Sequence, residues 1–383
     1  EETKDNADLI RLSRSYVQKA RELLLEKHRS GGGGMEIVAA YTTIMDHLVR
    51  HIYATASDDF SRRFPGQTSR SAVVAQGGFG RGELNPQSDI DLLFLYSWKV
   101  TPFLESVTER ILYTLWDAGL QVGSAVRTIA ESIRLADADL KVKTAILDTR
   151  FLCGDFSLYG DFEKALEKKL IKRRVARFIQ DKQQESRLRH ESYGGSVYLL
   201  EPEVKEGEGG LRDIHTARWI ARVKINAKDF DTLALGGIVS SNDVAKLKES
   251  QDFLFRVRNE LHFSSGKHHD QLTFADQEKV GAALGFQGEG TLRGVEVFMR
   301  SYYLHAAQIS RLTSLIIHRV IEHERPLFGA SYPFGRTLRE GIRLSRKHLS
   351  VTKAGVLRSD PANLIRIFDD MQKYGCELAH ETR

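Results

Sequence analysis

With 383 residues, 41% of them hydrophobic and 28% charged, the sequence is typical of a globular protein with two domains and part of a third, and no run approaches the roughly 20 apolar residues of a membrane-spanning helix. The net charge of +5 is spread along the chain, so we expect neither a nucleic acid nor a membrane as a partner. Because Cys153 and Cys376 are the only two cysteines, a disulfide framework and a thiolate metal site are excluded, and we expect a cytoplasmic protein.

Residues 1–60 are predicted to form an N-terminal helical arm. Residues 7–29 have the spacing of an amphipathic helix, and a second helix is expected over residues 35–58. Four glycines at 31–34 separate them. These glycines follow a helix rather than a strand, and no Lys-Ser or Lys-Thr pair closes them, so we interpret them as a flexible joint and not as a phosphate loop.

Residues 61–150 are predicted to form a small mixed β-sheet with flanking helices. Short apolar runs at 71–76 and 90–96 are typical of buried strands, and the first run ends at two glycines. The other elements expected here are the first turn of a helix at 79–84, a helix at 101–119 and a strand at 120–128.

Helical periodicity dominates the next part of the chain and predicts an all-α domain over residues 151–325. The fold class is therefore α+β. Helices are expected at 133–151, 161–189, 211–223, 242–262, 273–283 and 291–321. A break at Arg325-Pro326 precedes residues 326–383, which we interpret as the start of a linker or a further module with a helix at 362–374.

The stretch from Gly77 to Asp91 carries the residues with the clearest chemistry. Gly77 and Gly78 end a predicted strand, where backbone N–H groups can approach phosphate oxygens without interference from a Cβ atom. Arg81 offers a planar fork of donors for a phosphate. Asp89 and Asp91 are two residues apart at the start of a strand, so both point to one face. Because such close carboxylates repel each other, this pattern indicates a divalent cation between them, and Mg²⁺ fits best.

Each part of this pattern is weak when it stands alone, since an isolated Asp-x-Asp is more often a strand edge or a turn. The combination of Gly-Gly, ten further residues and Asp-Ile-Asp resembles the signature of the DNA polymerase beta-type nucleotidyltransferase superfamily. The longer string GGFGRGELNPQSDIDLLFLY is similar to the bacterial P-II protein uridylyltransferases, which are also uridylyl-removing enzymes. The segments LWDAGLQVGSAVRT, EVKEGEGGLRDIHTARWIAR and FLFRVRNELHF extend the resemblance, which covers residues 10–325.

The resemblance implies an Mg²⁺-dependent transfer of UMP from UTP to a tyrosine of the P-II signalling protein, with release of pyrophosphate. Asp89 and Asp91 would ligate the metal, and together with Arg81 they would be the catalytic residues. The nucleotide-binding residues implied are Gly77, Gly78, Phe79, Arg81, Ser88, Lys205 and Arg212. The resemblance further implies that the hydrolase domain and the ligand-sensing ACT domains of the family lie beyond the given sequence.

Two alternatives stay open. The superfamily usually supplies a third carboxylate from the next strand, and residues 120–128 contain none. The general base is therefore unassigned, with Asp148 as a weak candidate that a pairing with Arg150 explains equally well. Beside the uridylyltransferase interpretation, the alternatives are a related transferase for another nucleotide or acceptor, as in protein adenylylation, and a nucleotide-binding module without catalysis.

Two further motifs allow more than one interpretation. In Gly-Gly-Leu-Arg-Asp, Arg212 can reach the nucleotide phosphates or the protein substrate, while Asp213 can favour a helix N-terminus and pair with Arg212. The triplet at 268–270, His-His-Asp, follows a predicted helix, and we interpret it as a solvated loop and not as a metal site.

Overall fold

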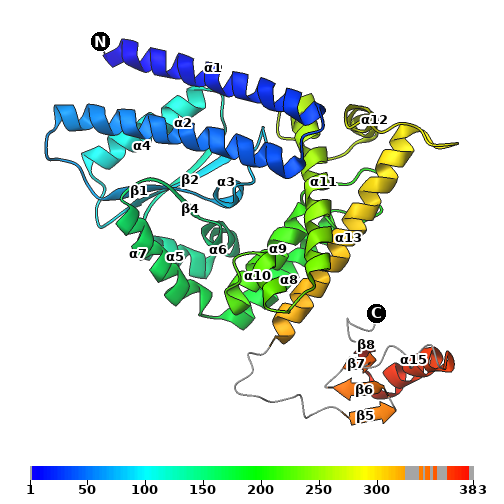
Figure 1. Ribbon diagram of the computed structural model, residues 1–383. Coiled ribbons are helices and arrows are strands. Elements are labelled where there is room, and N and C mark those ends of the chain that lie inside the picture. Colours follow the sequence, from blue (N-terminus) through cyan, green and yellow to red (C-terminus); the bar gives the residue numbers. More distant parts are fainter. Residues whose placement is uncertain (1, 324–335, 340, 346–347, 352–359, 379–383) are drawn as a thin grey trace. The chain divides into compact units, whose positions relative to one another are not determined.

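The computed structural model describes residues 2–323, 336–339, 341–345, 348–351 and 360–378 (Figure 1). The chain divides into two compact units, Glu1–Ile317 and His318–Arg383, and each is described by itself. In the described ranges, even the 29-residue helix α13 lacks an apolar stretch sufficient to cross a bilayer.

The first two helices confirm the predicted arm. They are α1 (Glu2–Arg29) and α2 (Gly34–Arg63), and they contact each other along the first unit. The glycines between them do not form the expected flexible joint. A Cβ atom on Gly34 would lie 2.2 Å from the carbonyl oxygen of Asp252, and the N–H of Met35 donates to Asp252 Oδ1 at 2.8 Å. The glycine is needed because the start of α2 packs directly on the backbone of α11 (Ser241–Ser265).

The sheet has the strand order β3-β2-β1-β4. β1 (Ser71–Ala75) pairs antiparallel with β2 (Ile90–Tyr96), and β2 pairs parallel with β3 (Val122–Thr128), so the three predicted strands are confirmed. Between them lie α3 (Gly77–Arg81) and α4 (Pro102–Asp117).

The prediction of one helix over residues 133–151 is wrong at its C-terminal end. The chain forms α5 (Ile129–Ala138) and α6 (Leu140–Leu147), and then a fourth strand, β4 (Arg150–Gly154), which pairs antiparallel with β1. Asp139 separates the two helices by accepting a hydrogen bond from the N–H of Val142 as an N-cap. The partner of β4 lies about 80 residues earlier in the chain, so local periodicity could not reveal this pairing. The expected domain boundary at residue 150 falls at the start of this strand.

Alternate side chains of the strands pack on the two faces of the sheet. Ile90, Leu92 and Phe94 of β2 belong to a core shared with α1, α2 and α4, whereas Leu93 and Leu95 pack with α5 and α7 on the other face. Asp91 points to the same face of the sheet as Leu93. It lies near the start of β2, beyond the residues of this second core.

The remainder of the first unit is helical, as predicted. Its elements are α7 (Phe156–Leu166), a π-helical turn (Glu167–Ile171), α8 (Val175–Ser192), α9 (Leu211–Ile225), the unpredicted short α10 (Phe230–Leu235), α11, α12 (Phe274–Ala283) and α13 (Gly294–Glu322).

Among its described residues, the second unit contains a four-stranded sheet in the order β5-β6-β7-β8 and, after the end of the long helix that leads into it, the helix α15 (Ala362–Tyr374). Its strands are β5 (Arg336–Arg339), β6 (Ile342–Ser345), β7 (His348–Val351) and β8 (Glu377–Leu378), none of which was predicted. The helix expected at 362–374 is confirmed. The predicted break at 325–326 lies outside the described residues.

Candidate active site

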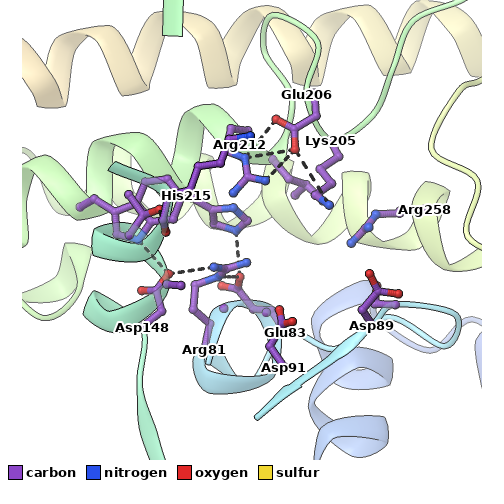
Figure 2. A pocket seen from close by; sticks show the side chains of 18 of the residues that line it. Arg81, Glu83, Asp89, Asp91, Asp148, Lys205, Glu206, Arg212, His215 and Arg258 are labelled. Carbon is purple, nitrogen blue, oxygen red and sulfur yellow. Dashed lines mark hydrogen bonds and ion pairs between the residues drawn. The ribbon is translucent and has the colours of Figure 1, made fainter. Parts of the chain in front are cut away.

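A cavity of about 550 Å³ opens in the first unit between the sheet and the helices that follow it. Figure 2 shows Asp89 and Asp91, at the start of β2, on one side, and Lys205, before α9, and Arg212, in its first turn, on the other. Of the predicted site residues, those that line the cavity are Gly77, Gly78, Arg81, Ser88, Asp89, Asp91, Lys205 and Arg212. Phe79 instead has its side chain in the core, with no exposed surface. The structure thus brings together two segments that are far apart in the sequence, although the individual roles stay predictions.

The glycine turn shapes the floor of this cavity around Asp91. Gly77 has a φ of +56°, and a Cβ atom there would lie 3.0 Å from Asp91 Oδ2. A Cβ atom on Gly123 of β3 would lie 2.4 Å from Asp91 Oδ1. Gly80 packs even more closely, since its Cβ atom would fall 1.7 Å from the carbonyl oxygen of Asp148. Glycine at 77 and 123 therefore lets the backbone surround the Asp91 carboxylate, and glycine at 80 lets α3 pack on the backbone at Asp148.

The two predicted metal ligands have no protein partners. Asp89 is exposed and Asp91 is half-buried, and among the described residues neither carboxylate accepts a hydrogen bond or has a cation within 4.0 Å. Burial, followed by the negative charge of Asp89, raises the pKa of Asp91 to about 6. Next to them, the buried Oγ of Ser88 has no hydrogen-bond partner in the described part of the chain. These groups are free to contact a ligand.

Arg81 lies between two buried carboxylates. Its Nε donates to Glu83 Oε2 at 2.6 Å and its Nη1 donates to Asp148 Oδ2 at 2.8 Å (Figure 2). Burial lowers the pKa of Arg81, but the charges of Glu83 and Asp148 outweigh this effect and raise it. Asp148 also accepts a hydrogen bond from Trp219 Nε1 at 2.7 Å. The pairing of Asp148 with Arg150 that we considered is wrong.

The opposite wall carries Lys205, Glu206 and Arg212. Arg212 Nη2 donates to Glu206 Oε1 at 2.6 Å, and Lys205 Nζ lies 3.9 Å from the same oxygen. Burial raises the pKa of Glu206, but its hydrogen bond with Arg212 and the charge of Arg212 lower it to about 2. Burial lowers the pKa of Lys205, and the neighbouring charge of Arg258 lowers it further. A basic wall therefore faces the two free carboxylates across the cavity.

Asp213 does not pair with Arg212, as we had considered. It accepts hydrogen bonds from Arg189 Nη2 at 2.6 Å and from the backbone N–H of Gly209 at 2.8 Å, and it lies 2.8 Å from His190 Nε2. Asp213 therefore ties the start of α9 to α8 and leaves Arg212 to Glu206.

Several residues that line the cavity were not singled out in the sequence, among them Glu83, His215 and Arg258. Glu83 and His215 contact each other at 2.8 Å, although 132 positions separate them. Both belong to quoted motifs, but no spacing rule predicts a contact between them. Arg258 is located in a helix whose periodicity gives no sign of a site.

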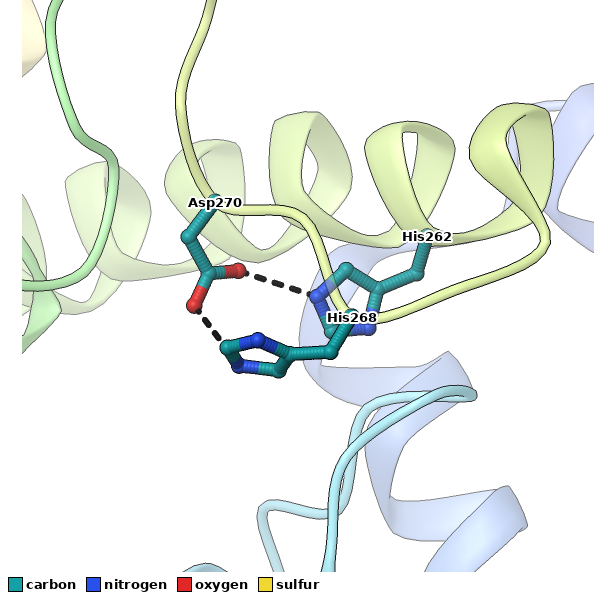
Figure 3. Close-up of side chains that lie close together, drawn as sticks. All are labelled: His262, His268 and Asp270. Carbon is teal, nitrogen blue, oxygen red and sulfur yellow. Dashed lines mark hydrogen bonds and ion pairs between the residues drawn. The ribbon is translucent and has the colours of Figure 1, made fainter.

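The triplet at 268–270 is less solvated than expected. Asp270 is buried, and Figure 3 shows it between His262 and His268, with ligand atoms of the three within 4.8 Å of one another. Arg258 occupies the same carboxylate through Nε at 2.7 Å and Nη2 at 3.0 Å. His262 Nδ1 accepts from the N–H of Gln87 at 3.3 Å, which leaves Nε2–H to donate to Asp270 at 2.9 Å. An arginine and a ring N–H already satisfy the carboxylate, so these residues form a hydrogen-bond network around Asp270.

Two family models match the chain. The one described as GlnD PII-uridylyltransferase matches residues 177–317, and the one described as nucleotidyltransferase domain matches residues 54–152. The second match contains the glycine turn and both aspartates.

Curated relatives extend the similarity to nearly the whole chain. A bifunctional uridylyltransferase/uridylyl-removing enzyme of Bradyrhizobium sp. (strain ORS 278) is 35% identical over 96% of this chain and 41% of that protein. Proteins of the same name from Rhodopseudomonas palustris and Rhodospirillum rubrum are 34% and 36% identical, each over 94% of this chain and over 40% and 39% of their own lengths. The chain spans about two fifths of the length of these relatives. The resemblance inferred from the sequence is confirmed.

Proposed function

Because the chain corresponds to the nucleotidyltransferase part of the bifunctional uridylyltransferase/uridylyl-removing enzymes, we propose that it transfers UMP from UTP to a tyrosine of a P-II protein and releases pyrophosphate. The observation that carries this proposal is the pair of unpartnered carboxylates, Asp89 and Asp91, beside a glycine turn and opposite a basic wall. The names of the relatives supply the nucleotide and the acceptor.

The residues of the cavity fit Mg²⁺. Two carboxylates that face one cavity, with no hydrogen-bond or ion-pair partner among the described residues, offer the oxygen ligands that this ion prefers, and the Ser88 hydroxyl, also without a hydrogen-bond partner there, lies nearby. When bound, Mg²⁺ would neutralise charge on the phosphates and orient the α-phosphate for in-line attack. Its charge would also offset the burial and the repulsion by Asp89 that together raise the pKa of Asp91.

The chain's own residues would bind and orient the nucleotide. Gly77 and Gly78 present backbone N–H groups toward the cavity at the start of α3, and Lys205 and Arg212 supply positive charge from the opposite wall. Arg81 lies beneath the turn and adds a third positive charge next to Asp91. Asp148 is occupied by Arg81 and Trp219, which disfavours it as the general base.

The test incubates the chain with P-II protein, Mg²⁺ and UTP labelled in the α-phosphate. We expect the label on a P-II tyrosine, identified by mass spectrometry, and no label with Asp91→Asn or in excess chelator. Transfer from labelled ATP instead would identify a different nucleotide. Tight nucleotide binding without transfer would identify a binding module and overturn the proposal.

We also propose that the protein is located in the cytoplasm. It is supported by the two free cysteines: Cys153 lies in the first unit and Cys376 in the second, and neither is in a disulfide.

A further inference from the structure

The charged groups that the proposed reaction needs come from two segments of the chain. Asp89 and Asp91 lie at the start of β2, while Lys205 and Arg212 lie in and just after the segment that leads into α9. A metal and a triphosphate between these walls must contact both at once, so the reaction depends on how accurately the two walls are held relative to each other.

Glu83 joins the two walls. Its side chain is buried, with 4% of its surface exposed, and it follows the glycine turn directly. From α9 it receives His215, whose Nε2 lies 2.8 Å from Oε2, and Arg218, whose Nη1 lies 3.3 Å from Oε1. From α11, Gln251 Nε2 donates to Oε1 at 3.4 Å. The carboxylate of Glu83 thus contacts two helices, α9 and α11, on the helical side of the cavity.

The same residue closes the glycine turn on the sheet side. The backbone N–H of Glu83 donates to the carbonyl oxygen of Gly78 at 2.9 Å, and its carboxylate accepts from Arg81 Nε at 2.6 Å. The glycine turn is also joined to β2, because the N–H of Gln76 donates to the carbonyl oxygen of Asp91 at 2.9 Å. A displacement of Glu83 would therefore move the turn that surrounds the Asp91 carboxylate.

The charge states of Glu83 and His215 follow from their surroundings. Burial raises the pKa of Glu83, but the charges of Arg218 and Arg81 and the hydrogen bond from His215 outweigh burial and hold it well below its usual range. Burial and the charge of Arg81 lower the pKa of His215 well below its usual value. The histidine is therefore neutral and donates Nε2–H to a charged carboxylate, while its buried Nδ1 has no partner among the described residues.

We propose that Glu83, which accepts from Arg81 on the sheet side and from His215 of α9 on the helical side, is a positioning residue that holds the metal carboxylates in register with the basic wall of the cavity. This proposal rests on the proposed function, because it assumes that metal and nucleotide occupy this cavity. Glu83 itself does not contact the substrate. It acts through the glycine turn and through Arg81.

The test compares Glu83→Gln with Glu260→Gln. Glu260 is a matched control because its fully buried carboxylate also joins distant parts of the chain, with Arg29 Nη2 at 2.7 Å and His28 Nε2 at 3.3 Å, between α1 and α11. It does not line the cavity. Both variants lose a buried charge and should unfold at lower temperature than the unchanged chain, which separates loss of stability from loss of positioning.

Mn²⁺ binding, followed by electron paramagnetic resonance, is the first readout because it requires no turnover. We expect Glu83→Gln to weaken Mn²⁺ binding by about 10- to 100-fold and to lower kcat by a similar factor, whereas Glu260→Gln changes either by less than about twofold. Glu83→Asp, which keeps the charge, should recover part of the loss. Equal metal affinity in the two glutamine variants would overturn the proposal.

The test remains informative if Glu83→Gln does not fold or if the unchanged chain transfers no UMP. If Glu83→Gln does not fold, Arg218→Gln removes one partner of the carboxylate and should weaken Mn²⁺ binding by about threefold to tenfold, and unchanged binding would count against the proposal. If the unchanged chain binds Mn²⁺ but transfers no UMP, the proposed function fails, whereas a selective loss of metal affinity in Glu83→Gln still supports the positioning role.

Discussion

Acidic residues in and next to the cavity differ in how their charge is compensated. Asp270 is surrounded by Arg258, His262 and His268, so its charge is compensated within the fold. Asp89 and Asp91 have no such partners in the described part of the chain, and the pKa of Asp91 is raised by burial and by Asp89. The compensated group stabilises the structure, whereas the uncompensated pair carries a cost that only a ligand can offset.

This difference separates the predicted metal ligands from the other acidic residues of the cavity. Paired acids are frequent along this cavity, and they include Glu83, Asp148 and Glu206. The absence of a partner among described residues, and not the presence of a carboxylate, distinguishes the predicted metal ligands.

The largest effect is expected for Asp91→Asn. A bound metal contributes several kcal/mol to transition-state stabilisation, so we expect transfer to fall by at least about 100-fold. Thermal unfolding should show no stabilisation by Mg²⁺, while in a chelator the variant should be at least as stable as the unchanged chain because one repulsive charge is gone. Near-normal transfer would contradict the assignment of Asp91 as a metal ligand.

Asp270→Asn should have the opposite profile. Removing one member of a buried ion pair leaves Arg258 uncompensated, and we expect the free energy of unfolding to fall by about 3 kcal/mol in urea titrations. Transfer by the folded protein should fall far less than in Asp91→Asn. If the two variants lose activity equally, the distinction between the two acidic groups is wrong.

A smaller effect is expected for Gly123→Ala. The new Cβ atom would lie 2.4 Å from Asp91 Oδ1, so the carboxylate must shift, and Mn²⁺ binding should weaken by about tenfold. Gly160→Ala in α7 is the matched control, since a Cβ atom there meets open space and alanine favours a helix. The control should bind Mn²⁺ normally, and a tenfold loss there would discredit the steric explanation.

The smallest effect concerns pH and Glu203. Its Oε2 accepts hydrogen bonds from the N–H groups of Lys205, Glu206 and Gly207, yet burial, with the charges of Asp270 and Glu206, raises its pKa to about 7. In the unfolded chain the carboxyl loses its proton near pH 4.5, so stability should fall as the pH rises from 4.5 to 7 and stay low above it.

Urea titrations at several pH values test this expectation. Glu203→Gln should remove about 1–2 kcal/mol of the decrease between pH 5 and pH 7. The exposed Glu109→Gln variant on α4 controls for the loss of one negative charge. An unchanged pH dependence in Glu203→Gln would show that another group is responsible.

Much of the fold could be predicted because its signals are local. The three strands around the glycine turn and most helices follow from periodicity, and the residues from Gly77 to Asp91 form a compact motif. β4 could not be predicted, because an edge strand is defined by a partner that lies elsewhere in the chain. The same holds for Glu83 and His215, whose contact joins segments that no spacing relates.

The close approach of Gly34 to the backbone at residue 252 has a consequence for the order of assembly. The start of α2 cannot reach its final place until α11 is present, although the rest of α2 packs with α4 and the sheet in one core. A fragment that ends at residue 155 would retain every strand of the first sheet, yet its N-terminal helices would lack the surface on which the start of α2 rests.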